Sequence, residues 1–91
     1  MTRLRRLGTG GGLTPVVQTQ TIQPDFTGFY SKPEGTVSWQ VTAIPTFGGT
    51  GWPKVGQDDF VVTIIENAVG RVGIADNSND TQEVEVTFYT Q

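Results

Sequence analysis

The side chains that could do chemistry in this 91-residue chain are few. It contains neither His nor Cys, which excludes a Cys nucleophile, a His general base, a disulfide and a Cys/His zinc site. The three Ser residues, Ser31, Ser38 and Ser78, have no His to activate them. Catalysis would have to rely on carboxylates alone, so the sequence predicts a protein that is not an enzyme.

Two groups of carboxylates could in principle act in catalysis or bind a metal ion. Asp58 and Asp59 are adjacent, and neighbouring residues of a strand point to opposite faces, so they would not act on one substrate. The stretch Asp76-Asn77-Ser78-Asn79-Asp80 places oxygen ligands at alternating positions, as a calcium loop does. Its sixth position is Thr81 instead of Gly and its twelfth is Thr87 instead of Glu. We therefore expect a polar hairpin loop, with no metal and no cofactor.

Residues 1–13 are predicted to form a flexible, basic, Gly-rich arm. Gly8-Thr9-Gly10-Gly11-Gly12 has neither the Lys nor the residue order of a phosphate-binding loop. The arm could be a solvated tail, an anchor on another protein, or a nucleic-acid contact, and three Arg on an acidic protein disfavour the last. It holds all the Leu of the chain, which favours an anchor. Its candidate partner-binding residues are Arg3, Leu4, Arg5, Arg6, Leu7 and Leu13.

From residue 14 onward the composition is typical of an all-β domain. The chain has 14 Thr and 11 Val, and β-branched residues favour pleated strands over helices. Alternation predicts strands over Thr36–Ala43, Asp59–Glu66, Arg71–Ala75 and Gln82–Thr90, while residues 16–22 could be a strand or a strap. The expected inward residues are Val37, Trp39, Val41, Ala43, Val72, Ile74, Val84, Val86 and Phe88. Because both faces of Asp59–Glu66 are apolar, that strand is expected to be central or covered.

Aromatic residues outside these strands could contact a ligand or partner. Residues 44–57 contain several Gly and Pro and are predicted to be a long loop that presents Phe47 and Trp52. These two rings could stack on a glycan or fill a partner's pocket, or they could fold over the end of the domain. Phe26, Phe29 and Tyr30 are expected to pack the N-terminal segment onto the body.

Charge divides the chain into two parts. Residues 1–31 carry a net charge of +2 and residues 32–91 carry −5, giving −3 for the whole chain. The basic start is followed by glycines instead of an apolar segment, and the longest apolar-rich run, Phe60–Ile65, is too short to span a bilayer. We therefore expect no signal peptide, no membrane segment and no Sec export.

The order of motifs from Gly35 to Gln91 resembles the BACON family of immunoglobulin-like domains. Trp39 lies in an alternating strand, and Trp52 follows a loop. Gly56 precedes a β-branched strand, Asn67 leads to an Arg-x-Gly-Ile strand at residues 71–74, and Thr90-Gln91 closes the last strand. The resemblance implies an immunoglobulin-like antiparallel β-sandwich of about six or seven short strands over residues 14–91, preceded by the extended N-terminal arm.

The same resemblance implies a non-catalytic binding or spacer module. Such domains are typical of surface proteins of gut bacteria and also occur in virion proteins of their tailed phages. With its basic arm, this chain is similar to an auxiliary or decoration protein that docks on a major capsid protein or another virion subunit. The expected location is the virion, assembled in the host cytoplasm. The alternative is a carbohydrate-binding module that adheres to mucin or other glycans.

Overall fold

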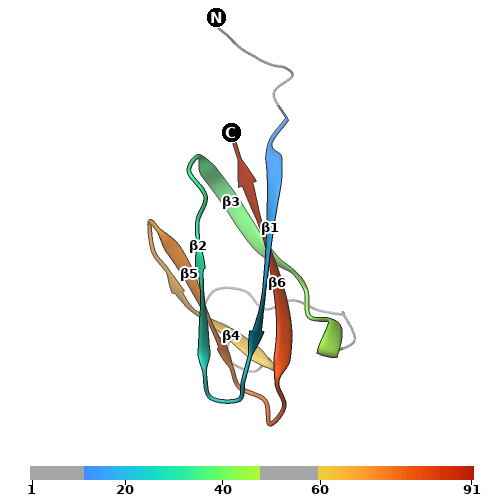
Figure 1. The fold of residues 1–91 in the computed structure, drawn as a ribbon. Coiled ribbons are helices and arrows are strands. Elements are labelled where there is room, and N and C mark those ends of the chain that lie inside the picture. Colours follow the sequence, from blue (N-terminus) through green and yellow to red (C-terminus); the bar gives the residue numbers. More distant parts are fainter. Residues whose placement is uncertain (1–11, 48–59) are drawn as a thin grey trace, which may run out of the picture.

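The structure, a computed structural model, describes residues 12–47 and 60–91. Its elements are β1 (Thr14–Ile22), β2 (Thr27–Ser31), β3 (Thr36–Ala43), the short 3₁₀ helix η1 (Pro45–Phe47), β4 (Val62–Asn67), β5 (Arg71–Asp76) and β6 (Gln82–Thr90). They form two antiparallel three-stranded sheets with the strand orders β1-β6-β3 and β2-β5-β4 (Figure 1). The prediction of an all-β sandwich with about six strands is confirmed.

The core lies between the sheets and is built from alternate residues of the strands. On β6, the central strand of the first sheet, Val84, Val86 and Phe88 are completely buried, as predicted. On β5, the central strand of the second sheet, Val72 and Ile74 are also completely buried. Among the described residues, the buried hydrophobic ones are Ile22, Tyr30, Val41, Ile44, Val62, Ile64, Val72, Ile74, Val84, Val86 and Phe88.

Two predicted inward residues of β3 do not reach the core: Val37, and Ala43, which is half-buried beside a second register shift between Val41 and Ala43. The pairing of β3 with β6 shifts register between Thr36 and Ser38, so Val37 has no partner on β6 and its side chain is 51% exposed. A bulge of this kind disrupts the alternation that the sequence pattern assumes. Trp39, beyond the bulge, is half-buried and packs against the core instead of lying within it.

The strand predicted at Asp59–Glu66 also differs. Phe60 and Val61 form a bend, the strand β4 begins at Val62, and Asp59 lies outside the described residues. The sequence predicts that this strand is central or covered. It is not central, because β5 is the central strand and β4 lies at the edge of its sheet as described, but it is covered where it begins, since Val62, Thr63 and Ile64 are all buried. A register shift between Ile64 and Glu66 leaves Ile65 53% exposed.

A tight turn joins β1 to β2 at one end of the sandwich. The backbone N–H of Phe26 donates to the carbonyl of Gln23 (3.0 Å), with Pro24 and Asp25 between them. Asp25 has a φ of 67°, which lies in the left-handed region. A type II β-turn requires a positive φ at its third position, which Asp25 occupies here. Pro24 suits the second position, because its ring fixes a negative φ.

The three aromatic residues beyond this turn do not form the predicted cluster. Successive residues of a strand point to opposite faces, and Tyr30 is completely buried whereas Phe29 is 42% exposed. Phe26, which lies before the strand, is 62% exposed. Of these three aromatic residues, Tyr30 alone is buried in the core.

The side of the sandwich between β1 and β2 is closed by side chains. The amide nitrogens of Gln18 and Gln20 donate to the backbone carbonyls of Ser31 (2.7 Å) and Phe29 (2.5 Å), respectively. The two glutamines share one face of β1, because they are two residues apart, and their hydrogen bonds to β2 show that this face points towards the second sheet. They satisfy carbonyl groups on the side of β2 that does not pair with β5.

Candidate functional site

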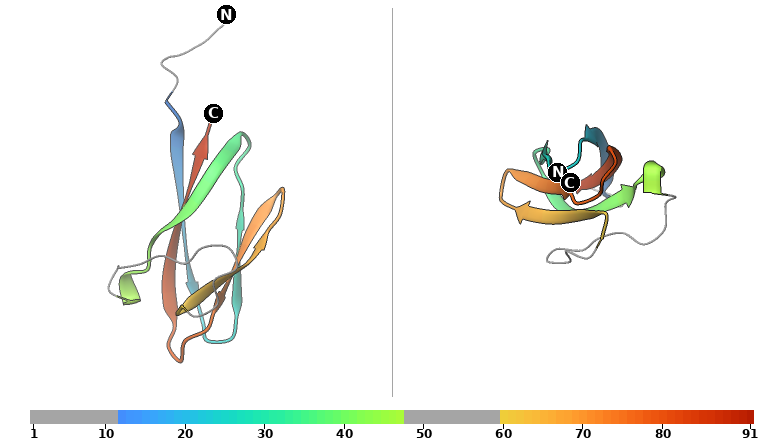
Figure 2. Two further views of the ribbon diagram at one scale, coloured as in Figure 1. Left: turned by 180° about the vertical axis from the view of Figure 1, so that it is seen from behind. Right: turned by 90° about the horizontal axis from the view of Figure 1, so that it is seen from below.

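The point at which residues 1–13 join the sandwich is well defined. β1 begins at Thr14, opposite Thr90 at the end of β6, so the two ends of the body lie at the same end of the sandwich (Figures 1 and 2). The hydroxyl of Thr90 donates to the carbonyl of Thr14 (3.1 Å), and the backbone of Gln91 bonds to Gly35 (3.0 Å). The first strand of the described body therefore begins at a fixed place beside the end of β6.

Of the predicted partner-binding residues, the structure describes one. Leu13 is 42% exposed, immediately before β1. Arg3, Leu4, Arg5, Arg6 and Leu7 lie outside the described residues. Trp52 and the side chain of Phe47 lie outside them as well, so glycan binding through these rings stays a prediction of the sequence.

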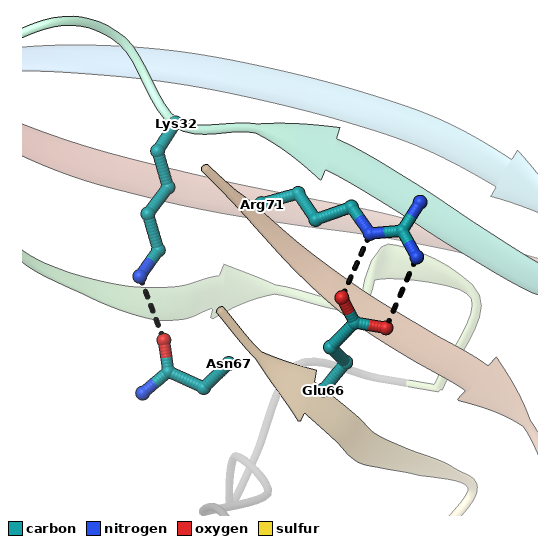
Figure 3. A network of polar contacts seen from close by, with 4 residues as sticks. All are labelled: Lys32, Glu66, Asn67 and Arg71. Carbon is teal, nitrogen blue, oxygen red and sulfur yellow. Dashed lines mark hydrogen bonds and ion pairs between the residues drawn. The ribbon is translucent and has the colours of Figure 1, made fainter. Parts of the chain in front are cut away.

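The described body is acidic. It contains seven of the nine acidic residues and two of the six basic residues, which gives it a net charge of −5. Its two cations are both engaged (Figure 3). Nζ of Lys32 donates to Oδ1 of Asn67 at 2.7 Å, and Nε of Arg71 lies 2.7 Å from Oε2 of Glu66. The charge of Arg71 is paired with a carboxylate, whereas Lys32 donates to a neutral amide.

These contacts tie neighbouring strands together on the surface. The hydrogen bond that the Arg71 guanidinium donates to the Glu66 carboxylate is the main cause of the raised pKa of Arg71. The guanidinium carbon of Arg71 also lies 4.0 Å from the centroid of the Phe29 ring, which is a cation–π contact. Oδ1 of Asn67 receives a second donor, the indole N–H of Trp39 at 3.2 Å, which links β4 to β3. These surface contacts hold neighbouring strands together. The residues that make them do not include a nucleophile beside a general base.

A shallow pocket of about 280 Å³ opens at the β1–β2 turn. Its lining residues are Gln20, Thr21, Ile22, Gln23, Phe26, Thr27 and Gly28. None of these side chains carries a charge, so the pocket offers no acid or base for catalysis.

The predicted polar hairpin loop follows β5. Asp76 closes the strand and is 1% exposed, and its Oδ1 accepts hydrogen bonds from the backbone N–H and the hydroxyl of Ser78 (2.8 and 2.6 Å). Gln82, the first residue of β6, donates to the same hydroxyl (2.9 Å). Among the described residues, no group of three or more acidic side chains is placed to hold a metal ion. Asp58 and Asp59 lie outside the described residues.

Sequence reasoning missed the contact that joins the sheets internally. The hydroxyl of Tyr30 on β2 donates to the carbonyl of Val84 on β6 at 2.7 Å, in the middle of the core. Burial raises the pKa of Tyr30, and a hydrogen bond from the backbone of Gln20 acts in the opposite direction. The available signal was a Tyr at an inward position, which needs a polar partner when it is buried.

Comparisons with known proteins found no match to this chain. No family model, no curated protein and no solved structure matches the chain. The described part also contains no helix that is long and apolar enough to cross a membrane.

Proposed function

We propose that this protein is a non-catalytic structural component of a virus particle, an auxiliary or decoration protein of a phage capsid. Residues 1–13 are its anchor, and the β-sandwich is the body that the anchor holds on the particle. The partner is a major capsid protein or another virion subunit, and the chain is assembled into the virion in the host cytoplasm.

The observation that carries the proposal is the separation of the chain's Leu and Arg residues from the core. All three Leu and three of the four Arg precede Thr14. The hydrophobic core of the described body, in contrast, is made of residues from Ile22 to Phe88. The described body forms a core without these residues, which supports a role for the Leu residues of 1–13 in binding a partner.

Energetics support an anchor that works in many copies. Ordering Gly8–Gly12 costs about 1 kcal/mol or more per residue, because glycine loses the most conformational freedom. Burying a Leu side chain contributes about 1.5–3 kcal/mol, so Leu4, Leu7 and Leu13 can offset much of that cost. A regular lattice of binding sites on a particle suits contacts of this modest strength.

Charge supports a protein partner. Arg3, Arg5 and Arg6 can form forked hydrogen bonds with carboxylates of another subunit. The net charge of −5 on the described body repels nucleic acid, which three arginines would have to overcome.

Substitutions in the anchor test the proposal. In the variant Leu4→Ser/Leu7→Ser, we expect incorporation into purified particles to fall at least about tenfold, because two buried Leu contacts are lost. The matched control is Thr2→Ser/Thr9→Ser, which changes two polar residues of the same segment and should be incorporated normally. Normal incorporation of the Leu variant would contradict an apolar anchor. Binding of a glycan array that is lost in Trp52→Ala would instead support the carbohydrate-binding alternative.

A further inference from the structure

The outer face of the sheet β1-β6-β3 is acidic. Its three strands contain no Lys or Arg. On β6, the residues buried in the core alternate with Glu83 and Glu85, so these two carboxylates point outward. The hydroxyl of Thr42 donates to Oε1 of Glu85 (2.7 Å), a neutral contact that leaves the negative charge in place. The ion pair found in the described part of the chain lies on the other sheet, so neither carboxylate has a cationic partner there.

The same face becomes apolar towards the end of β6. Val17 of β1 is 56% exposed and lies opposite Thr87. Pro15 is also exposed and lies opposite Tyr89. The Tyr89 hydroxyl accepts a hydrogen bond from Gln40 of β3 (2.9 Å), so the ring lies on the outer side of the sheet. Followed along β6, the face therefore presents two carboxylates first and an apolar patch after them.

The N-terminal segment carries the complementary pattern. Side chains of an extended chain alternate between two sides, so Arg3, Arg5 and Leu7 would share one side. The outward residues of β6 have the same period of two, and their order along the chain is acidic, acidic and then apolar. Two arginines followed by a leucine match this face in charge and in polarity.

The topology of the sheet determines the direction in which this segment could return. β1 begins at Thr14 opposite Thr90 and runs antiparallel to β6, so residues 1–13 join the body at the apolar end of the face (Figure 1). A segment that folds back from there over its own sheet has to run parallel to β6. In that direction, its arginines come to the acidic end and its leucine comes to the apolar end, as the pattern requires.

The segment is also long enough to reach the carboxylates. Residues 3–14 span up to about 36–40 Å when they are extended. The distance along β1 from Thr14 to Thr21, which lies opposite Glu83, is about 23 Å. The difference leaves chain for a reversal, and Gly10–Gly12 can adopt the positive φ values that a tight reversal needs.

We propose that residues 3–7 dock on the outer face of their own sheet in the free protein. The arginines pair with Glu83 and Glu85, and Leu7 contacts Val17. A short linker gives the chain's own segment an effective concentration in the mM range, which favours it over a second copy. Only the consequence rests on the proposed function: the docked segment has to leave this face before it can hold a partner, which lowers its apparent affinity for that partner.

Amide chemical shifts of the isolated protein test the contact. We expect the shifts of residues 83–89 to differ between the full chain and a chain that lacks residues 2–7. The differences should be independent of protein concentration and should decrease as NaCl is raised to about 1 M, because salt screens exposed ion pairs. Circular dichroism of both chains verifies that the body is folded in each.

The informative variant is Glu83→Lys, which reverses one charge on the face. Compared with its own truncated form, it should show shift differences at least about twofold smaller than those of the wild type, because one attraction becomes a repulsion. The matched control is Glu34→Lys, an equal change at an exposed residue in the turn before β3, which should keep the wild-type differences. Val17→Ser and Val69→Ser form the apolar pair, since Val69 is 99% exposed in the turn between β4 and β5.

Three results would overturn the inference. The first is identical shifts in the full and truncated chains, and the second is an equal loss in Glu83→Lys and Glu34→Lys. The third is a set of differences that appears only as the protein concentration rises, which would place the segment on a second copy. Any of these, together with loss of the truncated chain from purified particles, would remove the docked segment and leave the proposed function standing.

Discussion

The hydroxyl of Tyr30 and the carbonyl of Val84 lie 2.7 Å apart and join the two sheets of the sandwich through the core. Both residues are completely buried, so the bond is shielded from water. Gln20 lies directly opposite Val84 in the β1–β6 pairing, and its backbone also bonds to Tyr30. One side chain of β2 thereby contacts both β1 and β6.

Removing this hydroxyl should destabilise the fold. In Tyr30→Phe, the buried ring remains but the polar groups that it satisfied lose a partner, which costs about 1–3 kcal/mol. Urea unfolding at neutral pH measures the loss. The control is Tyr89→Phe, because the Tyr89 hydroxyl accepts a surface hydrogen bond from Gln40 (2.9 Å). A Tyr30→Phe variant as stable as Tyr89→Phe would contradict the role assigned to the bond.

Tyr30 should also make the protein sensitive to alkali. Burial raises the pKa of Tyr30 in the folded state above its ordinary value, so the unfolded chain releases the proton first. The resulting stabilisation is complete below about pH 10 and decreases above it, by up to about 1.4 kcal/mol per pH unit. Unfolding free energies measured from about pH 8 to about pH 11 should fall more steeply for the wild type than for Tyr30→Phe. Parallel curves would contradict this prediction.

Gly28 should not tolerate a side chain. A Cβ at this position would lie 2.8 Å from Oε1 of Gln20 and 2.8 Å from Cδ1 of Ile22. We expect Gly28→Ala to lower the free energy of unfolding by about 1–3 kcal/mol, because the side chains of the buried Ile22 and of Gln20 must move to make room for the new Cβ. Gly70→Ala is the matched control, since a Cβ there meets no atom within 4 Å. Equal melting temperatures for the two variants would disprove the close packing at Gly28.

Substitutions of Asp25 should change the stability of the protein according to how easily the new residue adopts a positive φ. Its φ of 67° is accessible to Gly and strained for a β-branched residue. Asp25→Val should therefore destabilise the protein by about 1–2 kcal/mol, whereas Asp25→Gly should be neutral or stabilising. Thermal unfolding of the two variants provides the comparison. A Val variant as stable as the Gly variant would show that the turn has a different conformation.

Alternation in the sequence was sufficient to predict that β5 and β6 are strands and which of their residues face the core, but not that these two strands are central. Val84, Val86 and Phe88 follow a regular period of two and lie at completely buried positions, as do Val72 and Ile74. The bulges at Val37 and Ile65 were not predictable, because an extra residue in one strand is defined by its partner strand. The order of strands within each sheet depends likewise on contacts between distant segments, which local patterns do not contain.

Polar contacts across the sandwich were harder to predict than the core. Gln18 and Gln20 alternate as residues on the inward face of a strand do. Their side-chain amides donate hydrogen bonds to backbone carbonyls of β2, and the sequence of β1 does not indicate that partner. Asp76 and Ser78 could be identified in the sequence as polar residues of a loop, whereas the burial of Asp76 could not be predicted. The spacing of residues in the sequence identifies polar side chains, whereas the tertiary structure determines which of them are buried and which groups they contact.

The most direct test of the anchor is the amount of a truncated chain in purified particles, measured by quantitative mass spectrometry. Deleting residues 2–13 removes the Leu and Arg of the anchor and leaves every strand of the body in place. We predict that the truncated protein keeps the wild-type circular dichroism spectrum and is lost from the particles. A correctly folded truncated protein that is incorporated at the wild-type level would contradict the proposed function.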